Sequence, residues 1–175
     1  PVKTKKLIND PKNIIEEMLD GIVKAHPNHV RQLEHSTRSV IAVDGPRKDK
    51  VAIVTGGDSG IGRATAVLFA REGAKVAIAY LEEHDDARIT REACEAEGAE
   101  VLLSAGDLGD PDHCRGLVDA VIGKWGRLDV LVNNAGEQHP DEDVTDITAE
   151  QLQRTFQTNI FSMFYLVQAA RPHLQ

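Results

Sequence analysis

Residues 50–62 read Lys-Val-Ala-Ile-Val-Thr-Gly-Gly-Asp-Ser-Gly-Ile-Gly, an apolar segment that runs into a glycine-rich turn. The β-branched residues Val51, Ile53 and Val54 favour a strand, and Ala64–Ala70 has the apolar spacing of a helix. Glycines in such a turn let the backbone approach phosphate groups, while the free N–H groups at the helix start face the negative charge. The stretch therefore predicts a nucleotide-binding site.

Glycine-rich turns also occur in ordinary loops, so the turn alone is a weak signal. Three later segments strengthen it: Asp107-Leu108 and Asn133-Asn134-Ala135-Gly136 each follow a predicted strand, and Asn159 lies in a long helical pattern. In this order and spacing, residues 48–175 resemble the short-chain dehydrogenase/reductase family. A simpler alternative for Asn133 and Asn134 is that they end a strand in a turn.

The resemblance implies an oxidoreductase that uses NAD or NADP and transfers hydride to or from a small carbonyl or alcohol substrate. It assigns a catalytic role to Asn159, which matches the helix asparagine that helps to hold a proton-relay water. The implied cofactor-binding residues are Gly56, Asp58, Ser59, Gly60, Ile61, Gly62, Tyr80, Asp107, Leu108, Asn134, Ala135 and Gly136.

The sequence contains only weak signals for the choice between NAD and NADP. The residue that binds the adenosine ribose is expected about 20 residues after the glycines, where Tyr80 stands. Glu82 and Glu83 would repel a 2′-phosphate and slightly favour NAD, whereas Arg63 is the basic residue close enough to reverse that preference. As an alternative, Glu82–Asp86 form the solvated start of a helix, where acidic side chains suit the dipole.

One part of the family pattern is missing from these 175 residues. Family members carry a serine and a Tyr-x-x-x-Lys pair after the Asn159 helix, and the lysine lowers the pKa of the tyrosine that transfers the substrate proton. Tyr165 is no substitute, because Ala169 stands four residues later. Whether the chain is an enzyme is therefore open: we expect little or no turnover, and the alternative is a non-catalytic or recombined nucleotide-binding module.

The first 50 residues differ in charge from the rest, with a net charge of +3 against −11 for residues 51–175. Lys-Lys-Leu-Ile-Asn-Asp-Pro at residues 5–11 and Ala-His-Pro at 25–27 resemble the start of dihydroxyacetone kinases, over residues 5–55. The kinase pocket residues are absent. We therefore predict two parts, a helical segment with an extra strand over 1–48 and a partial Rossmann domain over 49–175, and interpret the whole as a chimera.

Strand and helix patterns alternate after residue 50, which predicts an α/β fold with parallel strands joined by crossovers. The expected strands are Lys50–Thr55, Lys75–Tyr80, Glu100–Ser104 and Leu128–Val132. The expected helices are Ile61–Glu72, Asp85–Glu97, Pro111–Trp125 and Ala149–Leu174. The resemblance implies a Rossmann-like sheet in the order 3-2-1-4, with helices on both faces and its C-terminal side incomplete.

Composition excludes several other classes of function. The net charge of −8 argues against nonspecific nucleic-acid binding, and no apolar run reaches the roughly 20 residues of a membrane span. Cys94 and Cys114 lie far apart, which predicts reduced cysteines, a cytoplasmic location and no metal site. The last predicted helix is apolar on more than one face, so we expect it to mediate self-association.

Overall fold

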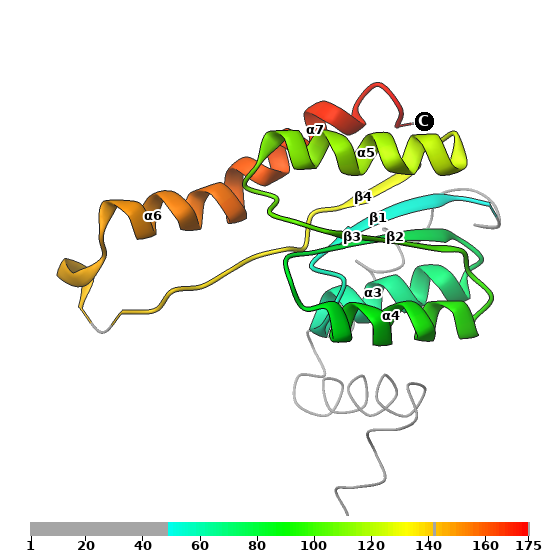
Figure 1. Cartoon of the computed structure of the whole chain (residues 1–175), viewed down its shortest axis with the longest axis horizontal. Helices are drawn as coiled ribbons and strands as arrows, with labels where there is room; N and C mark the ends of the chain where they lie inside the picture. The colour runs from blue at the N-terminus through cyan, green and yellow to red at the C-terminus, as the bar shows by residue number, and fades with distance from the viewer. Residues whose placement is uncertain (1–48, 142, 175) are drawn as a thin grey trace, which may run out of the picture. The chain divides into compact units, whose positions relative to one another are not determined.

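The computed structural model describes residues 49–141 and 143–174. Within these ranges it contains a four-stranded parallel sheet in the order β3-β2-β1-β4 (Figure 1). The strands are β1 (Val51–Thr55), β2 (Lys75–Tyr80), β3 (Val101–Ala105) and β4 (Val130–Val132). The predicted strand order is thus confirmed, whereas the helices and the strand predicted in residues 1–48 lie outside the described residues.

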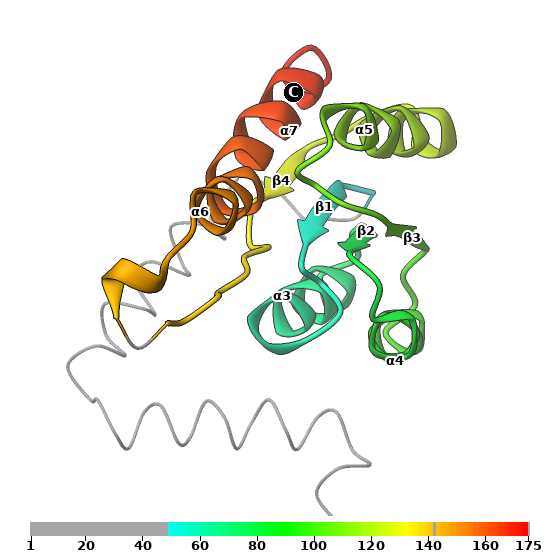
Figure 2. The ribbon, with the colours of Figure 1, turned by 60° about the vertical axis from the view of Figure 1, so that its left-hand side comes forward.

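Helices cover both faces of this sheet. They are α3 (Gly60–Arg71), α4 (His84–Ala96), α5 (Pro111–Trp125), α6 (Ala149–Phe156), the π-helical turn η2 (Gln157–Phe161) and α7 (Ser162–Ala170), with a short 3-10 turn η1 (Val144–Asp146) before α6. Figure 2 shows α3 and α4 on one face and α5 with α7 on the other. The fold is therefore Rossmann-like.

The core lies where the two central strands meet these helices. All five residues of β1 are buried, and so is β2 from Val76 onward, as expected for parallel strands covered on both faces. On one side Leu117 and Val121 of α5 pack with Leu166 of α7 in the same apolar cluster. The parallel pairing of β1 with β2 and β4 brings the carboxyl ends of the strands to one edge of the sheet.

Helix α5 shows how the sequence sets its boundaries. The Asp110 side chain accepts a hydrogen bond of 2.8 Å from the N–H of Asp112, and Pro111 occupies the first turn. Gly126 ends the helix with a φ of 74°, a conformation that glycine adopts without a steric penalty. The predicted bounds of α5 and β2 agree with the structure, and those of β1, β3, α3 and α4 agree within one residue.

Two boundaries were predicted wrongly. Strand β4 begins at Val130 instead of Leu128: the Asp129 side chain accepts from the N–H of Val51 at 3.0 Å, and Leu128 forms an isolated parallel bridge with Leu174. The expected continuous helix Ala149–Leu174 is divided by η2 and ends at Ala170, two residues before Pro172, which has no N–H to continue the helical hydrogen bonds. The π-helical turn η2 contains Asn159 and widens the helix there, just before Met163 in the first turn of α7.

A search of the described ranges finds no helix long and apolar enough to cross a membrane. The cytoplasmic location stays a prediction from the sequence.

Candidate functional site

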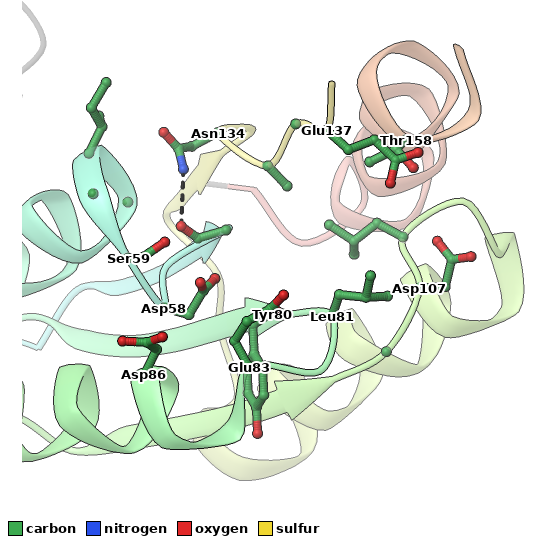
Figure 3. A pocket seen from close by; sticks show the side chains of 18 of the residues that line it. Asp58, Ser59, Tyr80, Leu81, Glu83, Asp86, Asp107, Asn134, Glu137 and Thr158 are labelled. Carbon is green, nitrogen blue, oxygen red and sulfur yellow. Dashed lines mark hydrogen bonds between the residues drawn. The ribbon is translucent and has the colours of Figure 1, made fainter. Parts of the chain in front are cut away.

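A cavity of about 630 Å³ opens at the carboxyl ends of the four strands (Figure 3). Every residue predicted to bind the cofactor lines it. The turn after β1 contributes Gly56, Asp58, Ser59, Gly60, Ile61 and Gly62, β2 contributes Tyr80, and the segments after β3 and β4 contribute Asp107, Leu108, Asn134, Ala135 and Gly136. Glu83, expected from the sequence to face a 2′-phosphate, also lines the cavity. The further lining residues, which the sequence did not assign to the site, are Leu81, Asp86, Gly106, Glu137, Arg154 and Thr158.

The glycine turn is built so that the backbone forms one wall of the cavity. Gly56 and Gly60 have φ values of 59° and 51°, which side chains rarely tolerate. A Cβ atom on Gly62 would lie 1.9 Å from the carbonyl oxygen of Gly56, so no other residue fits there without moving the turn. The start of α3 has no side-chain cap and no acidic residue in its first turn. Its first backbone N–H groups therefore remain available to an anion.

The Thr55 hydroxyl joins the turn after β1 to the segment after β4. It donates to the carbonyl of Val132 at 3.1 Å and accepts from the N–H groups of Asn134 and Ala135 at 2.9 and 3.0 Å. Asn134 Nδ2 in turn donates to the carbonyl oxygens of Thr55 and Gly56, and Figure 3 shows the second of these bonds. Because Thr55 is buried, these bonds fix the width of the cavity between β1 and β4.

Asn159, the predicted catalytic residue, lies beside the cavity. Its Oδ1 accepts from the N–H of Glu137 at 2.8 Å, and its Nδ2 donates to the Glu137 carbonyl at 2.8 Å. Both polar atoms of the side chain thus hold the segment after β4 against η2. Its role in proton transfer stays a prediction.

Arg154 of α6 joins two carboxylates of the cavity wall, Asp107 after β3 and Glu137 after β4. It forms ion pairs with Asp107 and, at 2.8 Å, with Glu137. The hydrogen bond from Arg154 holds the pKa of Asp107 below its ordinary value, and the N–H of Gly109 adds to this effect at 2.7 Å. Burial raises the pKa of Glu137, but the hydrogen bonds from Arg154, Thr158 and His139 and the charge of Arg154 together outweigh it, so the pKa is lowered. Both carboxylates are therefore charged at neutral pH.

We expect Arg154→Gln to raise the pKa of Asp107 toward the ordinary value of 3.8. A carboxylate with a lowered pKa stabilises the fold above its unfolded pKa, and this stabilisation is lost as the pH falls through the folded pKa. With the folded pKa of Asp107 closer to the unfolded value, Arg154→Gln should therefore have less of this stabilisation at neutral pH than the parent chain. Carboxyl NMR titration measures this directly. Arg115→Gln, which removes a charge paired with Asp112 instead, is the control, and equal Asp107 pKa values in both variants would contradict the assignment.

At the end of β2, Tyr80 is 7% exposed, and its hydroxyl lies 3.1 Å from His84 Nδ1. Arg63, expected from the sequence as a cation near this end, is held in place by three other residues. Its Nε donates to the carbonyl of Asp58 and to Thr90 Oγ1, both at 2.9 Å, and its Nη2 lies 2.8 Å from Asp86 Oδ1. The structure therefore adds Asp86 to the candidate ribose end.

Comparison with known proteins identifies similar chains. A family model described as short chain dehydrogenase matches residues 50–175. The uncharacterized oxidoreductase YhdF of Bacillus subtilis is 55% identical over 131 residues, which are 75% of this chain and 45% of YhdF. A crystal structure of a short chain dehydrogenase from Burkholderia cenocepacia J2315 in complex with NADP has a TM-score of 0.71 and 36% identity, over 74% of this chain and 53% of that one.

The uncharacterized oxidoreductase YhxC of Bacillus subtilis is 50% identical over 155 residues, which are 86% of this chain and 54% of YhxC. This match covers more of the chain than residues 50–175 do, so it includes part of the N-terminal segment. The comparisons thus give no support to the interpretation as a chimera with a dihydroxyacetone kinase. The chain spans about half the length of the curated relatives it matches.

Proposed function

The chain belongs to the short-chain dehydrogenase family, and on this premise we propose that its cavity binds NAD(H) or NADP(H) in an oxidoreductase that acts on a carbonyl or alcohol. When bound, the nicotinamide would supply or accept the hydride. The B. cenocepacia relative was solved with NADP, which supports a dinucleotide as the ligand.

The observation that carries this proposal is the absence of space for a Cβ atom at Gly62. A side chain there would overlap the carbonyl of Gly56, and the resulting bare turn places the N-terminus of α3 against the cavity. A backbone this close to an open site suits a pyrophosphate, which needs N–H donors and no intervening side chains. The residues present therefore fit the group.

The remaining wall residues suit the other parts of a dinucleotide. Asp107 and Leu108 would border the adenine, and the charged Asp107 carboxylate can accept a hydrogen bond from an exocyclic amine. Asn134, Ala135 and Gly136 would lie along the nicotinamide ribose, on the segment that Thr55 holds. Tyr80 and Leu81 would lie near the adenosine ribose.

Calorimetric titration of the chain with NADH and then NADPH tests the proposal. We expect saturable binding of at least one of them with a stoichiometry of about one, since the cavity has room for a single dinucleotide. For any glycine substituted in the turn after β1, Gly116→Ala is the matched control. A Cβ atom at Gly116 meets nothing within 4 Å, and the residue lies outside the cavity. A folded chain that binds neither cofactor would contradict the proposal.

The 175 residues hold no Tyr-x-x-x-Lys pair, because His84 and Ala169 occupy the fourth positions after the two tyrosines. The tests on this polypeptide therefore measure cofactor binding and do not depend on turnover.

We also propose that a second copy of the chain covers the apolar side of the C-terminal helices. Leu152, Phe156, Ile160 and Phe164 recur every four residues along α6, η2 and α7, and each is at least 40% exposed. Monomeric soluble proteins rarely expose such a continuous apolar row. The Phe156 and Phe161 rings already contact each other across the row, with centroids 6.4 Å apart.

Phe164→Glu is expected to shift the chain to a monomer, because a carboxylate would have to be desolvated in the apolar contact. Phe164 is 65% exposed, so the fold itself should tolerate the change. Light scattering after size exclusion measures the mass. Ile89→Glu on α4 is the matched control and should leave the mass unchanged, whereas equal masses for the parent chain and Phe164→Glu would refute this interface.

A further inference from the structure

The end of the cavity next to β2 is acidic. Asp58, Glu83 and Asp86 line it there, and the basic residue among the lining side chains, Arg154, is paired with Asp107 and Glu137. The labelled side chains of Figure 3 show Asp58, Glu83 and Asp86 close to the end of β2 and away from Asp107. This is the end expected to receive the adenosine ribose. An additional negative charge on that ribose would therefore meet carboxylates.

Among the residues that the structure describes, Arg63 is the cation that could offset this negative charge. Its guanidinium lies directly behind the glycine turn, because it donates to the carbonyl of Asp58 and to the hydroxyl of the buried Thr90. Nε makes both of these bonds, and Nη2 also donates to the Asp58 carbonyl at 2.5 Å, so the position of the group is fixed. Nη2 is directed to the cavity-lining residue Asp86, with which it forms an ion pair of 2.8 Å.

A 2′-phosphate and the Asp86 carboxylate would thus require the same cation. The two anions compete for Nη2 of Arg63. Asp86 belongs to the same chain and already lies next to Arg63, so it pairs without the loss of translational freedom that a bound phosphate would incur. Asp86 also repels the phosphate directly, since both carry negative charge. NAD lacks the phosphate and meets neither effect.

We propose that Asp86 is a specificity-determining residue that discriminates against the 2′-phosphate of NADP by occupying Arg63. This inference rests on the proposed function, because it concerns how the same cavity selects between two dinucleotides. Asp86 acts at the ribose, away from the reacting atoms, so its effect belongs to binding. The ratio of the NADPH and NADH dissociation constants reports it without any turnover.

The test is calorimetric titration of the full chain and its Asp86→Asn variant with NADH and with NADPH. We expect Asp86→Asn to strengthen NADPH binding relative to NADH by roughly three- to tenfold, the range for a partly exposed charge-assisted contact. In Asp86→Asn combined with Arg63→Gln the gain should disappear, because the freed cation is gone. Asp85→Asn removes the same charge one residue away, where the side chain is 95% exposed and outside the cavity, and should change the ratio less.

Three results would overturn the inference, and they are distinguishable. If both dinucleotides bind but Asp86→Asn moves the ratio no more than Asp85→Asn, the inference fails while the proposed function stands. If the gain persists without Arg63, Asp86 acts by repulsion alone and the competition for Arg63 is refuted. If neither dinucleotide binds the parent chain, the proposed function fails and the inference fails with it.

Discussion

Gly62→Val is expected to abolish binding of NADH and NADPH. Its Cβ atom would lie 1.9 Å from the carbonyl oxygen of Gly56 and 2.7 Å from Asn134 Nδ2, so the turn must open. The backbone N–H groups at the start of α3 would then move away from the pyrophosphate position. We expect a loss of stability of about 1–3 kcal/mol from the forced repacking. Calorimetry measures binding, and thermal unfolding measures stability.

Gly60→Asn separates loss of binding from loss of folding. Gly60 has a φ of 51° and nothing within 4 Å of a built Cβ, and asparagine tolerates this left-handed conformation better than other side chains. The variant should therefore fold while its side chain narrows the cavity, weakening NADH binding by roughly tenfold or more, the loss expected when a side chain hinders backbone contacts to phosphate. Unchanged NADH affinity in both Gly60→Asn and a folded Gly62→Val would mean that the turn does not hold the ligand.

Thr55→Val is expected to lower the free energy of unfolding by about 3 kcal/mol, because it keeps the shape of the side chain but leaves two N–H groups and one carbonyl without their partner. Those groups belong to Asn134, Ala135 and Val132, so the β4 side of the cavity should also lose its fixed position. We expect weaker NADH binding in addition to lower stability. Urea unfolding and calorimetry measure the two effects.

Two further threonine variants make this prediction specific. Thr55→Ser keeps the hydroxyl and should retain most of the stability and the cofactor affinity. Thr65→Val removes the hydroxyl of a half-buried threonine on α3, whose hydrogen bond to the Ile61 carbonyl is exposed to solvent, and should change the free energy of unfolding by less than about 0.5 kcal/mol. A Thr55→Val chain as stable as Thr65→Val would show that the hydroxyl does not join β1 to β4.

Local signals in the sequence were sufficient to predict β1, β2, β3, α3, α4 and α5. Apolar β-branched runs mark β1 and β2, and Asp110, Pro111 and Gly126 give α5 both of its ends. The predicted cofactor residues lie together because the carboxyl ends of parallel strands meet at one edge of a sheet, so the strand pattern was sufficient to predict this. Their binding roles stay predictions.

The features that sequence reasoning missed depend on partners far along the chain. Thr55 bonds to residues more than 75 positions away, and the Asp107 and Arg154 pair spans 47 positions. Neither pairing leaves a local pattern in the sequence. The π-helical turn around Asn159 likewise contains no proline or glycine that would have indicated it. The bridge from Leu128 to Leu174 joins residues 46 positions apart and has no local signal either.

Hydrogen–deuterium exchange of the chain with and without saturating NADH tests the central claim most directly, because it locates the ligand on the backbone. We expect slower exchange at residues 60–62 and 134–136, where the α3 N-terminus and the segment after β4 line the cavity. Gly116 and its neighbours on α5 should exchange equally in both states. Protection confined to α6 and α7, or absent from the glycine turn at saturation, would contradict the assignment of this cavity as the dinucleotide site.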